Sequence, residues 1–258
     1  MQKLLRKVRP GAPCSSPTGR CAVTTGSRRR VRSYYCPVPE NNRELQALTV
    51  ALSALAGFVD ALGFITLGGV FVSFMSGNST RFAVETADAS WRTAALIGGI
   101  VVLFVIGVIL GGVIAELTDR DRRTRKTAVL VTVAVLLAIG SLSAIPGWIP
   151  VAVTAMTLAM GVENSVFRRK GEATVALTYM TGALVKIGHE IASAFFGGPR
   201  WGWLPYLGRW GGLVAGGLLG ALAHHLFGLH ALWIATAVAA ALAVAVRFLR
   251  SPEVKKTA

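Results

Sequence analysis

Acidic residues are scarce in this sequence. Only 12 Asp and Glu accompany 27 Lys and Arg, and charged residues make up 15% of the 258 residues. Soluble domains usually carry about a quarter charged residues, whereas 53% of this chain is hydrophobic. Residues 127–162 and 210–246 contain no Asp, Glu, Lys or Arg. Because one bilayer crossing takes roughly 17 to 20 apolar residues, each segment predicts a helical hairpin, and the composition excludes an ordinary soluble domain.

Cysteine is also rare, and familiar catalytic motifs do not occur. Cys14, Cys21 and Cys36 have spacings that match no zinc or redox pattern. The sequence contains no G-x-S-x-G, H-E-x-x-H or P-loop motif, and no His or Cys pair with metal-ligand spacing. We therefore expect no cofactor, no metal site and no enzymatic activity, and an intramembrane lipid-processing enzyme ranks third among the functions considered.

The formal net charge of +15 is concentrated in the tails and short loops. Residues 1–43 hold ten Lys and Arg and one acid, Glu40, in a segment rich in Pro, Gly, Ser and Thr. This composition predicts a disordered basic tail. Beside a spanning helix, such a tail favours anionic lipid headgroups, and we expect no specific nucleic-acid partner. Residues 251–258 form a short C-terminal tail.

Hydropathy predicts an all-α, polytopic membrane helix bundle. The six expected spans are residues 46–67, 94–116, 127–146, 150–166, 208–226 and 229–248. Two weaker segments, 68–86 and 173–196, begin apolar, are broken by Gly beside Ser or Thr, and then carry charge. We interpret both as re-entrant or broken elements.

The distribution of basic loops predicts the topology. Lys and Arg in short loops concentrate on the cytoplasmic side, and residues 118–126 carry five of them. Placing this loop and the basic tail in the cytoplasm requires an even number of crossings between them, so 68–86 must turn back. The same argument applied to 173–196 leaves both termini in the cytoplasm. Eight spans rank second, because they would place residues 118–126 outside.

The sequence contains an internal repeat. A shift of about 105 residues aligns residues 74–77 (FMSG) with 179–182 (YMTG). The same shift places Arg81 on Lys186 and Glu85 on Glu190. It also places three glycines of the first half, Gly107, Gly111 and Gly112, on Gly212, Gly216 and Gly217. A shift of 104 places residues 57–60 on residues 161–164. This divides the membrane part into a first repeat (44–126) and a third span with the second repeat (127–250). Three crossings in each half predict an inverted-topology repeat, in which broken helices face each other near the midplane.

Two motifs carry a family resemblance. Residues 56–64 (AGFVDALGF) and 71–78 (FVSFMSGN) resemble the signature of the YoaK-like family of small bacterial membrane proteins, over residues 46–250. Ser76 stands where that family typically has Thr. The resemblance implies a multi-pass protein of the bacterial cytoplasmic (inner) membrane. It implies no substrate, because the family's function is unknown.

Polar residues in the apolar segments are the candidate site. An ionised carboxylate at the bilayer centre costs roughly 2.5 to 3.5 kcal/mol or more, so Asp60 is either a proton or cation site or a structural polar contact. Glu163 occupies the matching place in the second repeat, and its closeness to Arg168 and Arg169 favours a solvated helix-end acid. Asn164 is expected to hydrogen-bond across helices.

The two breaks supply the other candidates. Asn78 and Thr181 are expected to open short helices as N-caps, whose positive dipole ends suit an anionic or dipolar ligand. Arg81 and Lys186 follow in the first turn, either binding a solute or neutralising Glu85 and Glu190. The predicted substrate- or ion-binding set is Asp60, Ser76, Gly77, Asn78, Arg81, Glu163, Asn164, Thr181, Gly182, Lys186 and Glu190.

These observations favour a secondary transporter or channel-like permease for a small solute, with the two breaks framing the site. Asp60 would couple or gate, and Arg81 and Lys186 would set the charge preference. The alternative is a non-transporting membrane scaffold or partner subunit that uses its glycine faces and basic tail. The many glycines indicate close helix packing, more often internal than dimeric, and homo-oligomerisation stays open.

Overall fold

The computed structural model describes residues 20–23, 32–35, 43–118, 122–169, 172–173 and 180–248. The chain divides into two units, Met1–Gln46 and Ala47–Ala258. In the first unit, β1 (Arg20–Val23) pairs antiparallel with β2 (Arg32–Tyr35), with Arg20 opposite Tyr35. Most of the tail predicted to be disordered lies outside the described residues, so that prediction stays a prediction.

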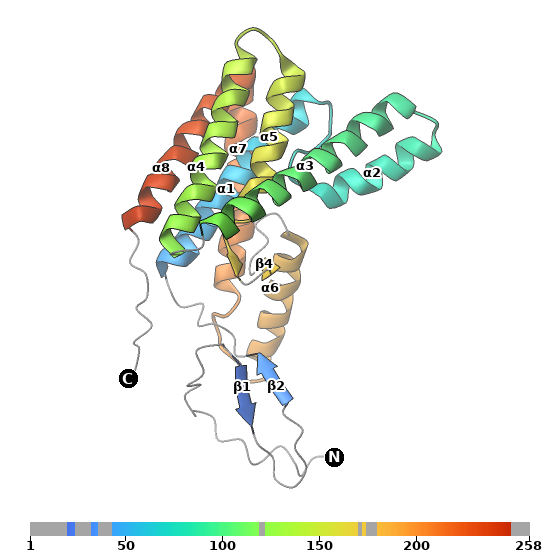
Figure 1. The fold of residues 1–258 in the computed structure, drawn as a ribbon. Coiled ribbons are helices and arrows are strands. Elements are labelled where there is room, and N and C mark those ends of the chain that lie inside the picture. Colours follow the sequence, from blue (N-terminus) through green and yellow to red (C-terminus); the bar gives the residue numbers. More distant parts are fainter. Residues whose placement is uncertain are drawn as a thin grey trace. The chain divides into compact units, whose positions relative to one another are not determined.

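Helices dominate the second unit (Figure 1). In chain order they are α1 (Arg43–Thr66), α2 (Met75–Ala87), α3 (Trp91–Leu117), α4 (Arg122–Ala144), α5 (Ile149–Glu163), α6 (Met180–Phe195), α7 (Leu204–Phe227), the 3₁₀ turn η2 (Gly228–Ala231) and α8 (Leu232–Phe248). Two short strands, β3 (Arg168–Arg169) and β4 (Glu172–Ala173), pair antiparallel after α5. The expected spans coincide with α1, α3, α4, α5, α7 and α8, and the weaker segments contain α2 and α6.

Four described segments are long and apolar enough to cross a bilayer. These are Glu44–Thr66, Trp91–Leu117, Arg123–Ala144 and Leu204–Phe248, the last of which contains α7, η2 and α8. Helix α5 is apolar but shorter. The helical membrane class is therefore confirmed, whereas the number of crossings stays a prediction.

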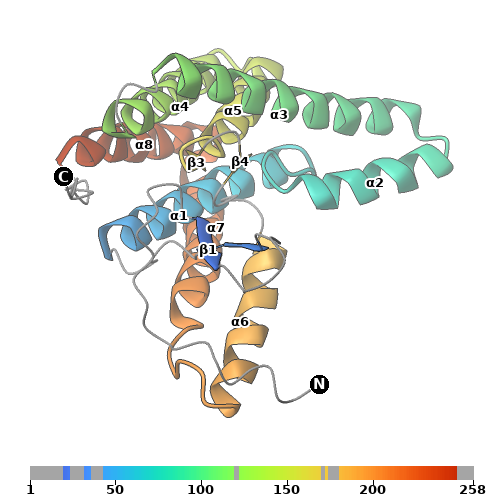
Figure 2. The same cartoon turned by 60° about the horizontal axis from the view of Figure 1, so that its bottom comes forward.

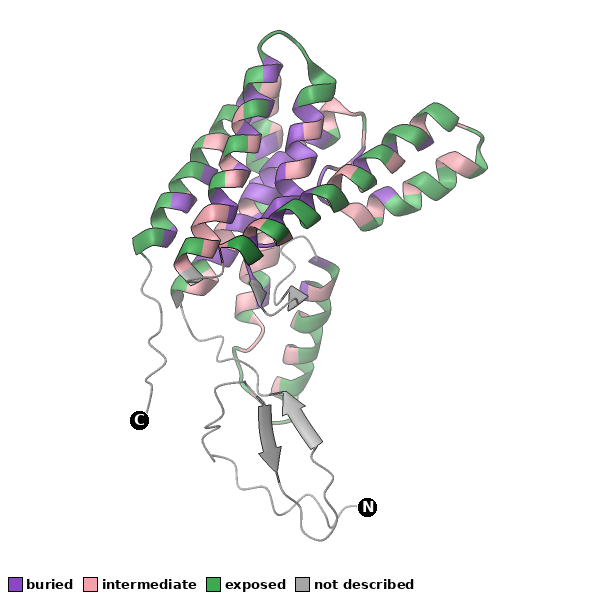
Figure 3. Ribbon diagram, in the orientation of Figure 1, coloured by how far each residue is buried: buried purple, intermediate pink, exposed green. Residues whose placement is uncertain are grey.

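Helix α4 packs against α8 and α5, and α5 packs in turn against α3. Buried side chains, among them Leu130, Leu137, Met156 and Met160, fill the space between these helices, while the outer faces are exposed (Figure 3). The outer faces are nevertheless apolar: Val102, Ile109 and Leu117 of α3 are all more than half exposed. Such a surface requires a lipid environment.

Two hairpins project from this bundle. Helix α2 packs against α3, and α6 packs against α7. Figures 1 and 2 show that the two hairpins extend in different directions from the central helices. Each hairpin follows a helix that ends in the core, so α2 and α6 occupy corresponding positions in the two halves.

Glycines permit two close helix crossings. On the α1–α7 crossing, a Cβ at Gly57, Gly216 or Gly220 would meet the backbone of Leu213, Ala54 or Phe58. On the α3–α5 crossing, a Cβ at Gly161, Gly107 or Gly111 would meet the backbone of Phe104, Leu158 or Val162. Small residues at such positions let helix backbones touch, as membrane helices often do. Each crossing joins a helix of one half to a helix of the other.

The glycine contacts at the two crossings follow similar spacings. Gly107 touches Leu158 and Gly216 touches Ala54, while Gly111 touches Val162 and Gly220 touches Phe58. Ala54 and Phe58 precede Leu158 and Val162 by 104 residues, the shift predicted for residues 57–60, whereas Gly107 and Gly111 precede Gly216 and Gly220 by 109. These contacts are compatible with a repeat in which α3 and α7 are aligned by 109 residues instead of 105, and the repeat itself stays a prediction.

Candidate functional site

Asp60 anchors a non-helical segment, residues 67–74, that joins α1 to α2. Its Oδ1 accepts hydrogen bonds from the backbone N–H groups of Val72 (2.8 Å) and Ser73 (2.9 Å). Asp60 is only 9% exposed, so an intramembrane acid satisfies backbone donors that lipid could not satisfy. The partners of Asp60 lie in the same half of the chain, so Asp60 makes at least a structural polar contact.

The chain reverses near the start of this segment, and the reversal requires glycine. Gly68 and Gly69 have φ angles of 62° and 96°, in the left-handed region that glycine adopts without steric cost. After the reversal, Val70, Val72 and Ser73 turn inward and are buried. The break predicted from the sequence therefore precedes Ser76 and Gly77, which belong to the first turn of α2.

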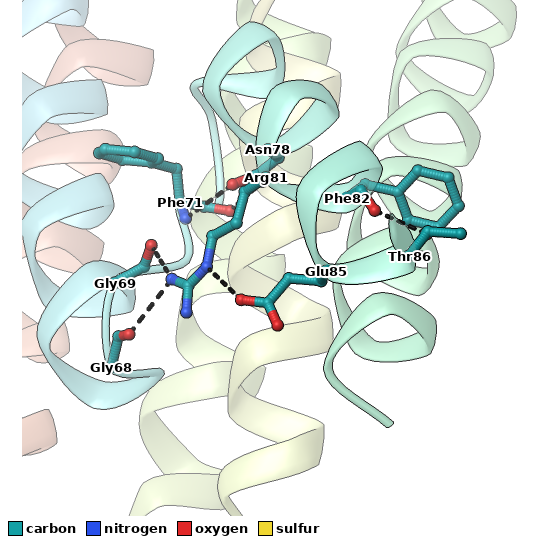
Figure 4. Close-up of polar contacts among 8 residues, drawn as sticks. All are labelled: Gly68, Gly69, Phe71, Asn78, Arg81, Phe82, Glu85 and Thr86. Atoms are coloured by element: carbon teal, nitrogen blue, oxygen red, sulfur yellow. Dashed lines mark hydrogen bonds and ion pairs between the residues drawn. The ribbon is translucent and has the colours of Figure 1, made fainter. Parts of the chain in front are cut away.

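Asn78 fixes the same segment from the other side (Figure 4). Its Nδ2 donates to the Phe71 carbonyl oxygen (2.6 Å), and its Oδ1 accepts from the Phe71 N–H (3.0 Å). The side chain is fully buried. The expectation that Asn78 opens the helix as an N-cap was wrong, because α2 begins at Met75 and Phe74 occupies the cap position. The side-chain amide of Asn78 instead pairs with both backbone groups of Phe71, as the backbone of a neighbouring strand would.

Arg81 joins α2 to the end of α1. Its guanidinium donates to the carbonyl oxygens of Gly68 and Gly69 and forms an ion pair with Glu85, with 3.3 Å between Nε and Oε1 (Figure 4). The carbonyl groups that follow a helix lack helical partners, and Arg81 satisfies two of them. The pairing with Glu85 agrees with one of the two interpretations made from the sequence.

A cavity of about 310 Å³ lies beside Asp60 and opens to the surface of the chain, where its lining residues Phe64 and Val214 are exposed. Residues of α1, including Gly57 and Asp60, form one wall, and Leu213 and Gly217 of α7 form the opposite wall, with Phe71 from the broken segment. Among the lining residues only Asp60 is charged. Ser76 and Gly77 do not belong to the lining, because the Gly77 Cα faces the rings of Phe74 and Phe71.

The second half presents a different arrangement. Thr181 and Gly182 lie in the first turn of α6, and residues 174–179 before them lie outside the described residues. The Lys186 ammonium lies 5.0 Å from the centre of the Tyr206 ring on α7, and Glu190 lies close to Gly202. The predicted meeting of the two breaks stays a prediction. Sequence reasoning missed Tyr206, because nothing in its local pattern marks it as a partner of Lys186.

Glu163 departs from its prediction. Glu163 is fully buried, and neither of its carboxylate oxygens has a hydrogen-bond partner within the described part of the chain. The interpretation as a solvated helix-end acid was wrong, because α3 and α4 both pack over α5. Asn164 donates to the Met160 carbonyl oxygen (2.9 Å) of its own helix, and the hydrogen bond across helices expected for it stays a prediction.

Asn78→Ala is expected to lower the free energy of unfolding by about 2 to 6 kcal/mol, because it leaves both backbone groups of Phe71 without a partner at roughly 1–3 kcal/mol each. Unfolding of the purified chain in detergent, followed by tryptophan fluorescence, measures this loss. Ser79→Ala is the matched control, because Ser79 is exposed and bonds only within α2. Equal stability of the two variants would contradict the assigned role of Asn78.

Comparison with known proteins supports a membrane family. Residues 48–245 match the family described as protein of unknown function (DUF1275). The UPF0700 transmembrane protein RA0705 of Rhizobium meliloti (strain 1021) is 34% identical over 199 residues, which cover 77% of this chain and 84% of that protein. The UPF0700 transmembrane protein YoaK of Bacillus subtilis (strain 168) is 28% identical over 155 residues, which cover 56% of this chain and 66% of that protein. No solved structure matches.

Proposed function

The chain belongs to the DUF1275 family of proteins of unknown function, and we propose that this integral membrane protein is a permease for a small, largely apolar solute. The resemblance to the YoaK-like family is thereby confirmed. The observation that carries the proposal is the cavity between α1 and α7, with a carboxylate in its wall and a non-helical segment at its edge.

The broken segment supports a transport pathway. Non-helical backbone at membrane depth persists only where protein buries it or where it lines a wet cavity. Residues 67–74 meet both conditions in part, since Val72 and Ser73 are buried while Phe71 lines the cavity. Broken helices beside a site between two halves are a recurrent feature of secondary transporters.

The paired glycine crossings support the inverted repeat. In the proposed repeat, α1 corresponds to α5 and α3 corresponds to α7. Because α1 crosses α7 and α3 crosses α5, each crossing joins a helix of one repeat to a helix of the other. An odd number of crossings in each half would invert the second copy. The cavity then lies at a crossing between the two repeats, where rocking of one repeat against the other would open it to alternate sides of the membrane. The basic loops support an inner-membrane protein with both termini in the cytoplasm.

The cavity indicates the class of solute. Its lining is apolar apart from Asp60, so a solute with one polar group would place that group at the carboxylate. Arg81 and Lys186 contact Gly68, Glu85 and Tyr206 instead of the cavity. The proposal therefore assigns solute recognition to Asp60 and gives these two cations positioning roles.

A scaffold that recruits partners through glycine faces is less well supported. The glycines at both crossings already contact helices of this chain, which leaves them covered. A small-residue face offered to another protein would have to lie elsewhere.

A single cysteine in the cavity wall tests the permease. In a background lacking Cys14, Cys21 and Cys36, Ala221→Cys is expected to react with a membrane-impermeant thiol reagent both in intact cells and in inside-out vesicles, because alternating access exposes the site to each side in turn. Ala221 lines the cavity. The control is Ala239→Cys on α8, at a position with no exposure, which should stay unmodified.

Either of two outcomes would overturn the proposal. Reaction at Ala221→Cys no faster than at Ala239→Cys would mean that water does not reach the cavity. Reaction from one side only would identify a blind pocket.

A further inference from the structure

The turn between α6 and α7 combines exposed aromatic rings with cations. Phe195 and Phe196 are 82% and 92% exposed, and Trp201 is 61% exposed. Such rings are too apolar to remain in water, and Trp in particular concentrates at the membrane–water interface. The turn is fixed internally, because the Trp203 indole N–H donates to the Arg200 carbonyl oxygen (3.1 Å) and the Gly198 N–H donates to the Ser193 carbonyl oxygen (3.0 Å).

One cation lies on a ring of this turn and two lie on Tyr206, in the first turn of α7. The Arg200 guanidinium lies 5.5 Å from the centre of the Trp201 ring. Lys186 of α6 and Arg209 of α7 lie 5.0 and 5.2 Å from the centre of the Tyr206 ring. Neither Arg200 nor Lys186 forms an ion pair with another described residue. The carboxylate of Glu190 lies close to Gly202 in the same turn.

The cations near this turn favour a ligand with negative charge. Arg200 and Lys186 form no ion pair with another described residue, and an anion beside either of them would gain Coulomb attraction. Because α7 and α8 are joined by the short turn η2, the start of α7 lies on the same membrane side as Arg247 at the end of α8. Basic residues on that side indicate the cytoplasmic leaflet, where anionic lipids attract Lys and Arg.

We propose that the α6–α7 turn is a binding site for the headgroup of an anionic phospholipid. Phe195, Phe196 and Trp201 insert at the boundary between headgroups and acyl chains. Arg200, beside Trp201, holds the phosphate, and Lys186 and Arg209 add positive charge on the neighbouring Tyr206. These residues do not line the cavity beside Asp60, so the site stands whether or not the protein transports a solute.

Quenching of a single tryptophan by brominated lipid tests this site in the full chain. Trp201 is retained, the other five Trp are replaced by Phe, and the protein is reconstituted in phosphatidylcholine vesicles containing dibrominated phosphatidylglycerol or dibrominated phosphatidylcholine at equal mole fractions. We expect phosphatidylglycerol to associate preferentially. Because each cation near an anionic surface contributes about fivefold in association, Arg200→Gln should reduce this preference about fivefold.

Trp148 provides the matched control. It lies in the α4–α5 turn, is 63% exposed, and belongs to the charge-free residues 127–162. A chain retaining only Trp148 should show no preference between the two lipids. Equal preference at Trp148 and Trp201 would overturn the proposal, as would an absence of quenching of Trp201 by either lipid.

A second measurement avoids dependence on the multiply substituted chains. Adding phosphatidylglycerol to the otherwise unmodified protein in neutral detergent is expected to raise its unfolding temperature, and Arg200→Gln should remove most of that rise. Phosphatidylcholine should produce no such rise. If the rise survives in Arg200→Gln combined with Lys186→Gln, the lipid binds elsewhere and the proposed site is wrong.

Discussion

Gly216→Ala is expected to lower the free energy of unfolding by about 3 kcal/mol, at the upper end of the cost of overpacking a core. The added Cβ would overlap the carbonyl oxygen of Ala54, and no rotamer change can relieve a clash between a Cβ and backbone. Helices α1 and α7 would have to separate. Because these helices form the two walls of the cavity, the same substitution is expected to widen it and to increase the reactivity of Ala221→Cys.

Gly211→Ala on the same helix provides the control. An added Cβ at Gly211 meets nothing within 4 Å, and alanine in a helix is favoured over glycine by about 0.8–1.0 kcal/mol. We therefore expect Gly211→Ala to be neutral or slightly stabilising when both variants are unfolded in detergent. Gly107→Ala and Gly99→Ala repeat the comparison on α3. A loss shared by all four variants would mean that helix contact is not what these glycines provide.

The positions of the helices could be predicted from the sequence because bilayer crossing leaves a simple signal. Residues 127–162 contain no charge and a central Pro-Gly pair, and α4 and α5 lie on the two sides of that pair. The weaker segments could also be recognised, since Gly beside Ser or Thr interrupts their apolar runs. Length and hydropathy do not depend on tertiary contacts, which is why these predictions succeed.

Contacts between residues far apart could not be predicted in the same way. Asn78 has the residue type of an N-cap, yet its partner is the backbone of Phe71, which reaches it only after the reversal at Gly68 and Gly69. Glu163 lies near Arg168 in sequence, which suggested solvent, but packing of α3 and α4 over α5 buries it. In each case the local pattern was compatible with two environments, and tertiary packing selected the other one.

The alignment of the predicted repeat depends on tertiary contacts as well. Residues 57–60 and 161–164 each carry a charge or amide after a glycine and a short apolar run, which favours one shift of 104 residues. Helices α3 and α7 each contain several glycines at irregular spacings, so the sequence alone allows several registers for them. The backbone atoms that Gly107, Gly111, Gly216 and Gly220 touch favour a shift of 109.

Asp60→Ala is expected to have the largest effect at the candidate site. It removes the acceptor for the Val72 and Ser73 amides, both of which are buried. Hydrogen bonds to charged groups contribute about 1.5–3 kcal/mol each, so the free energy of unfolding should fall by about 3 to 5 kcal/mol. Detergent unfolding followed by tryptophan fluorescence measures the loss. Unchanged stability would mean that Asp60 does not hold the broken segment.

Asp60→Asn separates the structural role of this residue from its proposed transport role. The asparagine Oδ1 can still accept from both amides, so the fold is expected to survive with a loss of about 1–2 kcal/mol, the difference between charged and neutral acceptors. Reaction of Ala221→Cys from both sides should continue in this background if Asp60 only positions the segment. If Asp60 instead drives the change of access, Asp60→Asn should restrict the reaction to one side while the protein stays folded. A stable variant with access from one side would therefore assign the carboxylate to the transport cycle, beyond its contacts with Val72 and Ser73.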